Sequence, residues 1–283
     1  AATRAQMDVV VNFASDITKA LAPEAGAERK AIAGVFDTAL TRLEADASLS
    51  RADRLGALMA RVQLARIDTP KDERHPKLPA ALVQRVREHV ARDDKDITDG
   101  YERQAVITSG AWALGQAGQW AESDALLKAN LAKSHSPYYL MSQLAGNARK
   151  LGKKDEALRW YEESYAKSEG PATRLQWGSG YFSALVELAP QDAVRIERVA
   201  RQLFAEAAKD PAAFHERSAR SLQRVGSKLA EWNKGGQHEA TLRRLTDGAD
   251  GQPGLGAVCG KLEAADAQRA TCEGIVKTLG KKA

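Results

Sequence analysis

Two stretches of equal length decide the fold: ITSGAWALGQAGQWAESDALLKANLAKSHSP at residues 107–137 and MSQLAGNARKLGKKDEALRWYEESYAKSEGP at residues 141–171. Each contains a glycine, Gly118 or Gly152, at the point where a first helix should end. These glycines define an offset of 34 residues. At that offset small residues align with small residues and large apolar residues with large ones: Ala111 with Ala145, Ser123 with Ala157, Leu127 with Tyr161 and Leu131 with Tyr165. Each stretch is therefore predicted to form a helical hairpin.

A helix–turn–helix unit that recurs every 34 residues is the tetratricopeptide pattern. Alanine, leucine, arginine and glutamate are abundant, whereas aromatic residues make up only 6% and prolines number nine, which suits a helical protein. We predict an all-α fold, a right-handed α-solenoid of tetratricopeptide-like hairpins with about 14 helices. Three regions are expected: an N-terminal helical region at 1–100, the repeats at 101–210 and a C-terminal helical cap at 211–283.

Apolar residues at helical spacing also predict the flanking elements. Helices are expected at about residues 3–21 and 28–45, and Ser50 is placed to cap a third. The stretch TPKDERHPKLP at residues 69–79 holds three prolines and predicts a loop. Pro211 is expected to start a helix that runs past Trp232.

Charge and hydropathy indicate which partners to expect. The sequence has no run of 18 apolar residues, so no membrane span is predicted. The net charge is +5, but 42 basic and 37 acidic residues are interspersed as on solvated helix faces, which argues against a nucleic-acid partner. The start, AATRAQMDVVV, already reads as an amphipathic helix without an initiator methionine or a signal peptide. We therefore expect a mature or excised fragment.

The two cysteines, Cys259 and Cys272, flank a predicted bend at Ala265 and Asp266. Asp266 can cap the helix that follows, and an antiparallel helix pair would bring the two cysteines level. Small neighbours let their Cα atoms approach within the roughly 4.4–6.8 Å that a disulfide requires. A structural disulfide is the favoured interpretation. The alternative is a pair of buried, reduced thiols in a cytosolic protein.

No residue set in the sequence predicts an active site. The five histidines are scattered, and none has a second histidine or cysteine at helical spacing, so neither a metal nor another cofactor is expected. Nucleotide-binding glycine motifs and the serine-hydrolase elbow are missing from the sequence. The two cysteines are too far apart for a redox CxxC pair. We predict that the chain is not an enzyme.

Binding is the remaining class of function. In tetratricopeptide repeats the first helix of each pair lines a concave surface. Ten residues are predicted to line it for protein or peptide binding: Thr108, Trp112, Gln116, Tyr139, Ser142, Arg149, Lys150, Leu175, Phe182 and Ser183. An aromatic and basic lining would suit an extended peptide with acidic groups or a C-terminal carboxylate. Alternatively the aromatic residues belong to the core, because a phase error of one residue exchanges groove for core, and Arg149 and Lys150 form a solvated helix end.

Four segments carry a resemblance to a known family: RLQWGSGYFSALVELAPQDAVRIE at 174–197, SDALLKANLAKSHSPYY at 123–139, LSRADRLGALMARVQLARID at 49–68 and KLEAADAQRATC at 261–272. They resemble the C-terminal helical region of a family of bacterial periplasmic thioredoxin-like proteins. In that family a signal peptide and a thioredoxin domain with a CxxC motif precede a long helical extension. This chain has no CxxC and no βαβ pattern, so the resemblance implies an accessory region and not the redox activity itself.

Three hypotheses about the function follow. The favoured one is a non-catalytic, periplasmic interaction domain that presents protein or peptide clients to a thioredoxin module, possibly one that is covalently linked. The alternatives are a superhelical hydrolase of the lytic transglycosylase type, which would need a catalytic glutamate in an inserted domain, and a stand-alone periplasmic scaffold.

Overall fold

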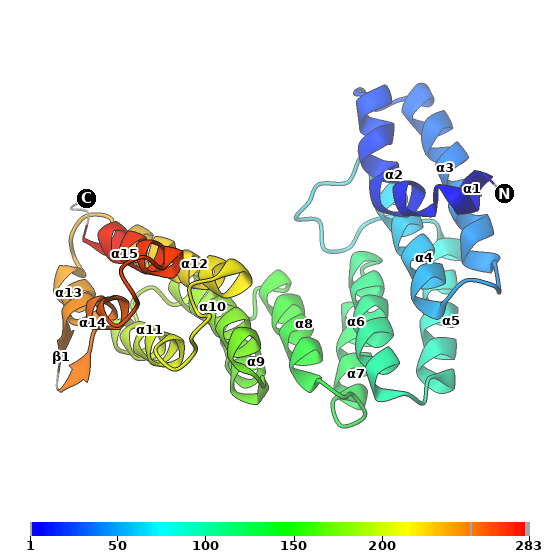
Figure 1. Cartoon of the computed structure of the whole chain (residues 1–283). Helices are drawn as coiled ribbons and strands as arrows, with labels where there is room; N and C mark the ends of the chain where they lie inside the picture. Colours follow the sequence, from blue (N-terminus) through cyan, green and yellow to red (C-terminus); the bar gives the residue numbers. More distant parts are fainter. Residues whose placement is uncertain (1, 250, 281–283) are drawn as a thin grey trace. The chain divides into compact units, whose positions relative to one another are not determined.

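The computed structural model describes residues 2–249 and 251–280, and it is all-α, as the sequence predicts (Figure 1). Helices account for 73% of the chain. The described residues contain fifteen helical segments, the first of only four residues, close to the predicted number. The chain divides into two compact units, Ala1–Lys153 and Lys154–Ala283. This division falls inside the region predicted as repeats, 101–210.

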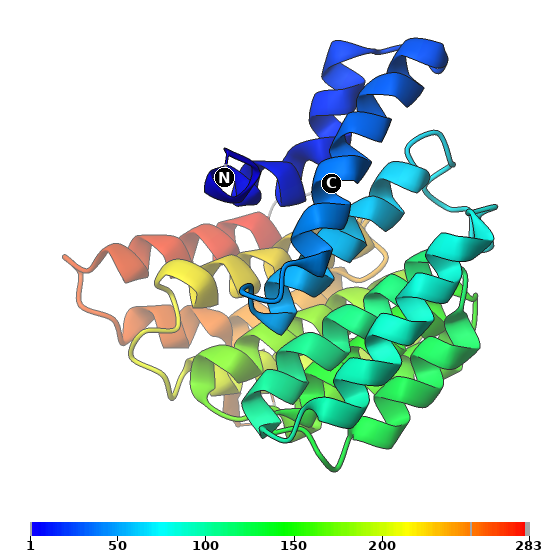
Figure 2. The same cartoon turned by 90° about the vertical axis from the view of Figure 1, so that its right-hand side faces the viewer.

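The first unit consists of eight helices (Figures 1 and 2). They are α1 (Ala2–Ala5), α2 (Met7–Leu21), α3 (Ala27–Ala45), α4 (Arg51–Ala65), α5 (Ala80–Asp96), α6 (Gly100–Gln116), α7 (Trp120–Asn130) and α8 (Pro137–Lys150). Helix α4 is apolar on two faces and joins two cores. Leu64 lies in the core that α4 shares with α2 and α3, and Leu58 lies in the core that it shares with α5, α6 and α7.

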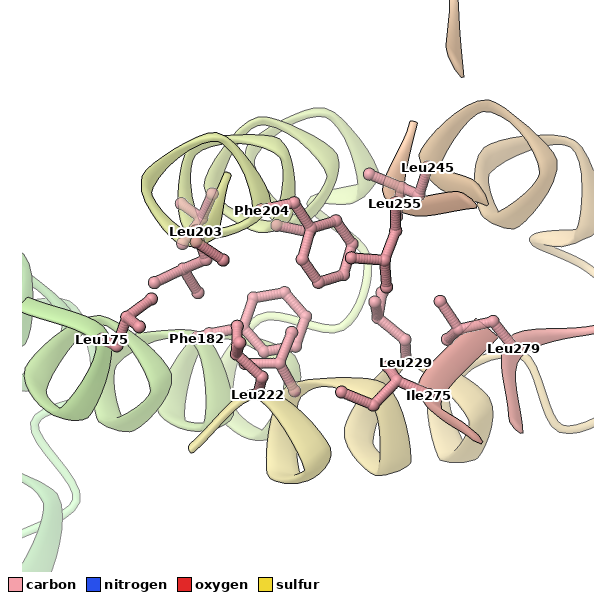
Figure 3. Close-up of a cluster of buried hydrophobic side chains, with 14 of the residues drawn as sticks. Leu175, Phe182, Leu203, Phe204, Leu222, Leu229, Leu245, Leu255, Ile275 and Leu279 are labelled. Carbon is pink, nitrogen blue, oxygen red and sulfur yellow. The ribbon is translucent and has the colours of Figure 1, made fainter. Parts of the chain in front are cut away.

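The second unit contains the remaining elements. They are α9 (Lys154–Lys167), α10 (Pro171–Leu188), α11 (Ala193–Ala207), α12 (Glu216–Trp232), α13 (Glu239–Asp247), β1 (Gly248–Ala249), β2 (Gln252–Pro253), α14 (Leu255–Gly260) and α15 (Ala267–Leu279). One continuous core runs from α9 to α15. Figure 3 shows Phe182 of α10 directed toward Phe204 of α11 and Leu222 of α12, in the middle of this core.

The 34-residue period reappears in the helix boundaries. Helices α7 and α9 begin at Trp120 and Lys154, and α8 and α10 begin at Pro137 and Pro171, so both pairs keep the offset. Prolines at the first helical position suit a helix start because their missing N–H would have no partner there.

Small residues close the helix contacts at matching positions. Ala111, Ala145 and Ser179, which lie 34 residues apart, are all completely buried. Gly118 and Gly152 have φ angles of +78° and +77°, the left-handed conformation that ends a helix at low cost for glycine. The repeat motif therefore governs the local structure as well as the sequence.

The C-terminal disulfide lies where the sequence predicts it. Cys259 and Cys272 are bonded, with an S–S distance of 1.95 Å and a Cα–Cα distance of 5.5 Å. The carboxylate of Asp266 accepts a hydrogen bond from the Gln268 N–H and so caps α15. The bond joins α14 to α15 at the end of the second core.

Two details of the second unit differ from expectation. The helix expected from Pro211 begins at Glu216, because the preceding residues form turns with Asp210 accepting from the Ala213 N–H. The glycine-rich stretch before α14 forms a two-residue antiparallel ladder in which Gly248 pairs with Pro253. A ladder this short carries no periodic sequence signal.

Candidate functional site

One face of α6 carries three of the predicted binding residues. Thr108, Trp112 and Gln116 follow each other at four-residue spacing, which places them on one helix face. All three are half-buried. The Trp112 ring packs against the core formed by α4 to α7, while the Thr108 hydroxyl donates to the Gln104 carbonyl at 2.6 Å. Trp112 is thus anchored by the core and still reaches the surface.

Helix α8 packs against α6 and carries the next four predicted residues. Tyr139 and Ser142 are half-buried, whereas Arg149 and Lys150 are exposed in the last turn of the helix. Gly146 occupies the place that Trp112 holds one repeat earlier. A Cβ atom at Gly146 would meet nothing within 4 Å, so the surface beside it is open. The seven residues on α6 and α8 are called the α6–α8 face below.

A buried polar chain fixes α8 against α6 and α7. The Asn147 side-chain amide donates to the Ser123 hydroxyl and to the Asp124 carboxylate, both at 2.8 Å. The Ser123 hydroxyl in turn donates to the Ala111 carbonyl at 2.7 Å. Asn147 and Ser123 are almost completely buried, so losing either would leave unsatisfied polar groups. The sequence analysis did not predict this hydrogen-bonded network. The available signal was Ser123, a polar residue at the position where the second repeat has Ala157.

Helix α10 is the first helix of the third predicted repeat. Two of the three binding residues predicted on it are wrong. Leu175 and Phe182 are 1% and 0% exposed and belong to the core of the second unit (Figure 3), so they cannot line a groove. Ser183 is half-buried, and its hydroxyl donates to the Ser179 carbonyl. Phe182 therefore cannot share an exposed surface with Trp112, Tyr139 and Arg149.

The cause of the error is a misplaced repeat register, by one residue for Leu175 and by two residues for Phe182. At the 34-residue offset Leu175 aligns with Ile107 and Met141, and all three are buried. Phe182 likewise aligns with the buried Leu114. The positions that match Thr108 and Trp112 are Gln176 and Gly180, which are both half-buried. Strict counting from Gly118 would have identified them.

A cluster of charged residues is buried between α3, α4 and α5. Glu44 accepts hydrogen bonds from Arg61 Nη1 at 2.7 Å and from Arg85 Nε at 2.5 Å. His89, which is completely buried, lies with Nδ1 3.5 Å from Glu44 Oε1 and Nε2 3.4 Å from Asp93 Oδ2. Sequence analysis missed this cluster because Glu44, Arg61 and His89 lie on three separate helices.

Protonation in this cluster is shifted by burial and by neighbouring charges. Burial alone would raise the pKa of Glu44, but contacts with His89, Arg61 and Arg85 outweigh it and lower the pKa to about 2. Burial alone would lower the pKa of His89, but Asp93 and Glu44 outweigh it and raise the pKa. His89 and Glu44 are out of reach of a substrate, so the cluster is structural and holds three helices together.

Two further observations concern other kinds of site. Among residues 2–249 and 251–280, no group of three histidine, cysteine or acidic side chains is arranged to hold a metal ion. No helix in the same part of the chain is long and apolar enough to cross a bilayer.

The candidate site is thus the α6–α8 face of the first unit, without the two buried residues of α10. The chain matches no family model and no curated protein.

Proposed function

We propose that this chain is a non-catalytic interaction module that holds an extended peptide or protein segment on the α6–α8 face. One observation carries the proposal. All seven residues that the sequence predicts for this surface in the first unit stay partly or fully accessible, on two helices that contact each other.

The chemistry of the face suits a peptide. Trp112 and Tyr139 offer aromatic surface, which contributes much binding energy for little loss of side-chain entropy. Gln116 and Ser142 can exchange hydrogen bonds with a peptide backbone. Arg149 and Lys150 add positive charge at one end of α8, which favours an acidic group or a C-terminal carboxylate in the ligand.

The setting of the module is also part of the proposal. The resemblance of four segments to the helical extension of periplasmic thioredoxin-like proteins suggests a role in presenting clients to a thiol–disulfide domain. A disulfide between Cys259 and Cys272 is compatible with such an oxidising compartment. These cysteines are 2% and 0% exposed, so the bond cannot readily meet an attacking thiolate, which favours a structural role.

Selection from a displayed random-peptide library tests the proposal. The wild-type chain is the bait, and the variant Trp112→Ala/Arg149→Glu/Lys150→Glu is used for counter-selection. Peptides enriched by the wild type should bind the triple variant at least about tenfold more weakly, a loss of about 1.4 kcal/mol.

The matched control is Lys95→Glu/Lys133→Glu, which reverses two exposed charges elsewhere in the first unit. It should leave binding unchanged. Equal enrichment by the wild type and the triple variant would show that the α6–α8 face does not bind peptides.

A further inference from the structure

Helix α11 in the second unit has a clear division between a buried and an outward face. Ile196, Val199 and Leu203 point into the core. The outward face begins with Val194, which is 82% exposed, the highest value among the large hydrophobic residues that the structure describes. Arg198, Arg201 and Ala205 follow at helical spacing on the same face.

This face forms one wall of a groove of about 540 Å³. Six of its seven lining residues lie on α11, and the seventh, Gln252, belongs to β2. An exposed valine beside arginines and glutamines combines an apolar contact, positive charge and amides that can bind a peptide backbone.

The charged residues of the groove differ in how closely they are paired. The Glu197 carboxylate forms ion pairs with Arg244 Nη2 at 2.6 Å and with Arg201 Nη2 at 2.8 Å, and these contacts lower the pKa of Glu197. One carboxylate therefore faces two guanidinium groups. Arg198 is held only loosely, with Nη2 3.7 Å from Glu162, a carboxylate that Arg195 already binds at 2.8 Å. The Arg198 side chain is 65% exposed.

We infer that this groove is a docking site for an acidic peptide segment that carries an aliphatic side chain. The aliphatic group covers Val194, and a carboxylate pairs with Arg198. Val194 and Arg198 are about 6 Å apart along the helix axis. Because an extended chain advances about 3.3 Å per residue, and alternate side chains share a face, the aliphatic residue and the acidic residue should be two positions apart. The site is separate from the α6–α8 face and does not depend on it.

The test uses a synthetic peptide with leucine and aspartate two positions apart in a glycine–serine background. Two matched peptides replace the aspartate with asparagine or the leucine with glycine. Each is titrated to about 1 mM into the full isotope-labelled chain, a range that detects millimolar dissociation constants, and amide chemical shifts are followed by NMR. Shifts should gather on α11 and β2 and weaken at least about tenfold with either matched peptide.

Variants of the protein make the result specific. Val194→Asp and Arg198→Glu should each weaken binding at least about tenfold, while Arg217→Glu on the exposed side of α12 should leave it unchanged. Trp112→Ala should also have no effect, which separates this site from the proposed function. The absence of shifts on α11 at the highest concentration would overturn the inference. Equal binding of the asparagine peptide, or an equal loss with Arg217→Glu, would do the same.

Discussion

Replacing Glu44 with glutamine should destabilise the first unit far more than other substitutions of ion-paired glutamates. The Glu44 side chain is only 2% exposed and serves Arg61, Arg85 and His89 together. Removing one member of a buried ion pair typically costs about 3–5 kcal/mol because the remaining charge stays buried without a partner. Arg61 keeps its contact with Asp37 at 2.8 Å, and Arg85 is partly solvated, so we expect the lower end of that range.

The pKa of Glu44 leads to a similar magnitude. A carboxyl group whose pKa falls from 4.5 to about 2 on folding contributes about 3 kcal/mol at neutral pH. Because the folded pKa is the lower one, this stability is present above pH 4.5 and is lost as the pH falls toward about 2. The difference between wild type and Glu44→Gln should shrink over the same range.

The assay has two readouts. Urea unfolding at pH 6 measures the free energy of unfolding, and a separate hydrogen-exchange experiment measures protection of the amides in α3, α4 and α5. The control is Glu102→Gln, because Glu102 also pairs with an arginine, Arg51, at 3.0 Å, but both side chains are about a third exposed. That variant should lose less than about 1 kcal/mol. A loss for Glu44→Gln no larger than that of the control would refute the reasoning, as would unchanged exchange in α3 to α5.

Three further substitutions or titrations test other parts of the structure. Gly178→Ala should cost about 1–3 kcal/mol because the new Cβ would lie 2.5 Å from Leu203 Cδ2, whereas Gly180→Ala on the same helix has open space and should be neutral or stabilising. A thermal melt that ranks the two variants the other way contradicts the packing of α10. Replacing Cys259 and Cys272 with serine should remove about 3 kcal/mol and speed hydrogen exchange in α14 and α15 but not in α6 to α8, and two titratable thiols in unreduced wild-type protein would disprove the bond. By NMR titration His89 should have a pKa above 6.5 and His238 a pKa below 6.5, and a His89 pKa below 6.5 would contradict its pairing with Glu44 and Asp93. The stability that His89 adds should be present below pH 6.5 and should fade as the pH rises through the pKa of His89 in the folded state.

Much of the fold could be predicted because residues within each repeat mark where its helices start and end. Gly118 and Gly152 mark helix ends, Pro137 and Pro171 mark helix starts, and these signals need no knowledge of distant residues. The third repeat lacks the turn glycine: Val186 stands at its place and α10 continues to Leu188. Without this glycine, the third repeat has no fixed point from which to align its residues with those of the first two repeats.

The parts that could not be predicted depend on contacts between distant segments. The burial of Glu44 with His89 joins residues 45 positions apart on helices with no shared motif. The groove on α11 also needs Gln252, which a two-residue strand brings close. Only the folded chain shows that Val194 is left 82% exposed.

The most direct test of the proposed function is to map where a library-selected peptide binds. Amide chemical shifts of the isotope-labelled chain are compared with and without the peptide. The proposal predicts that the largest changes fall on α6 and α8, around Trp112, Ser142 and Gly146, and disappear in the Trp112→Ala/Arg149→Glu/Lys150→Glu variant. Changes confined to other helices, or a selection that yields no peptide specific for the wild type, would contradict it.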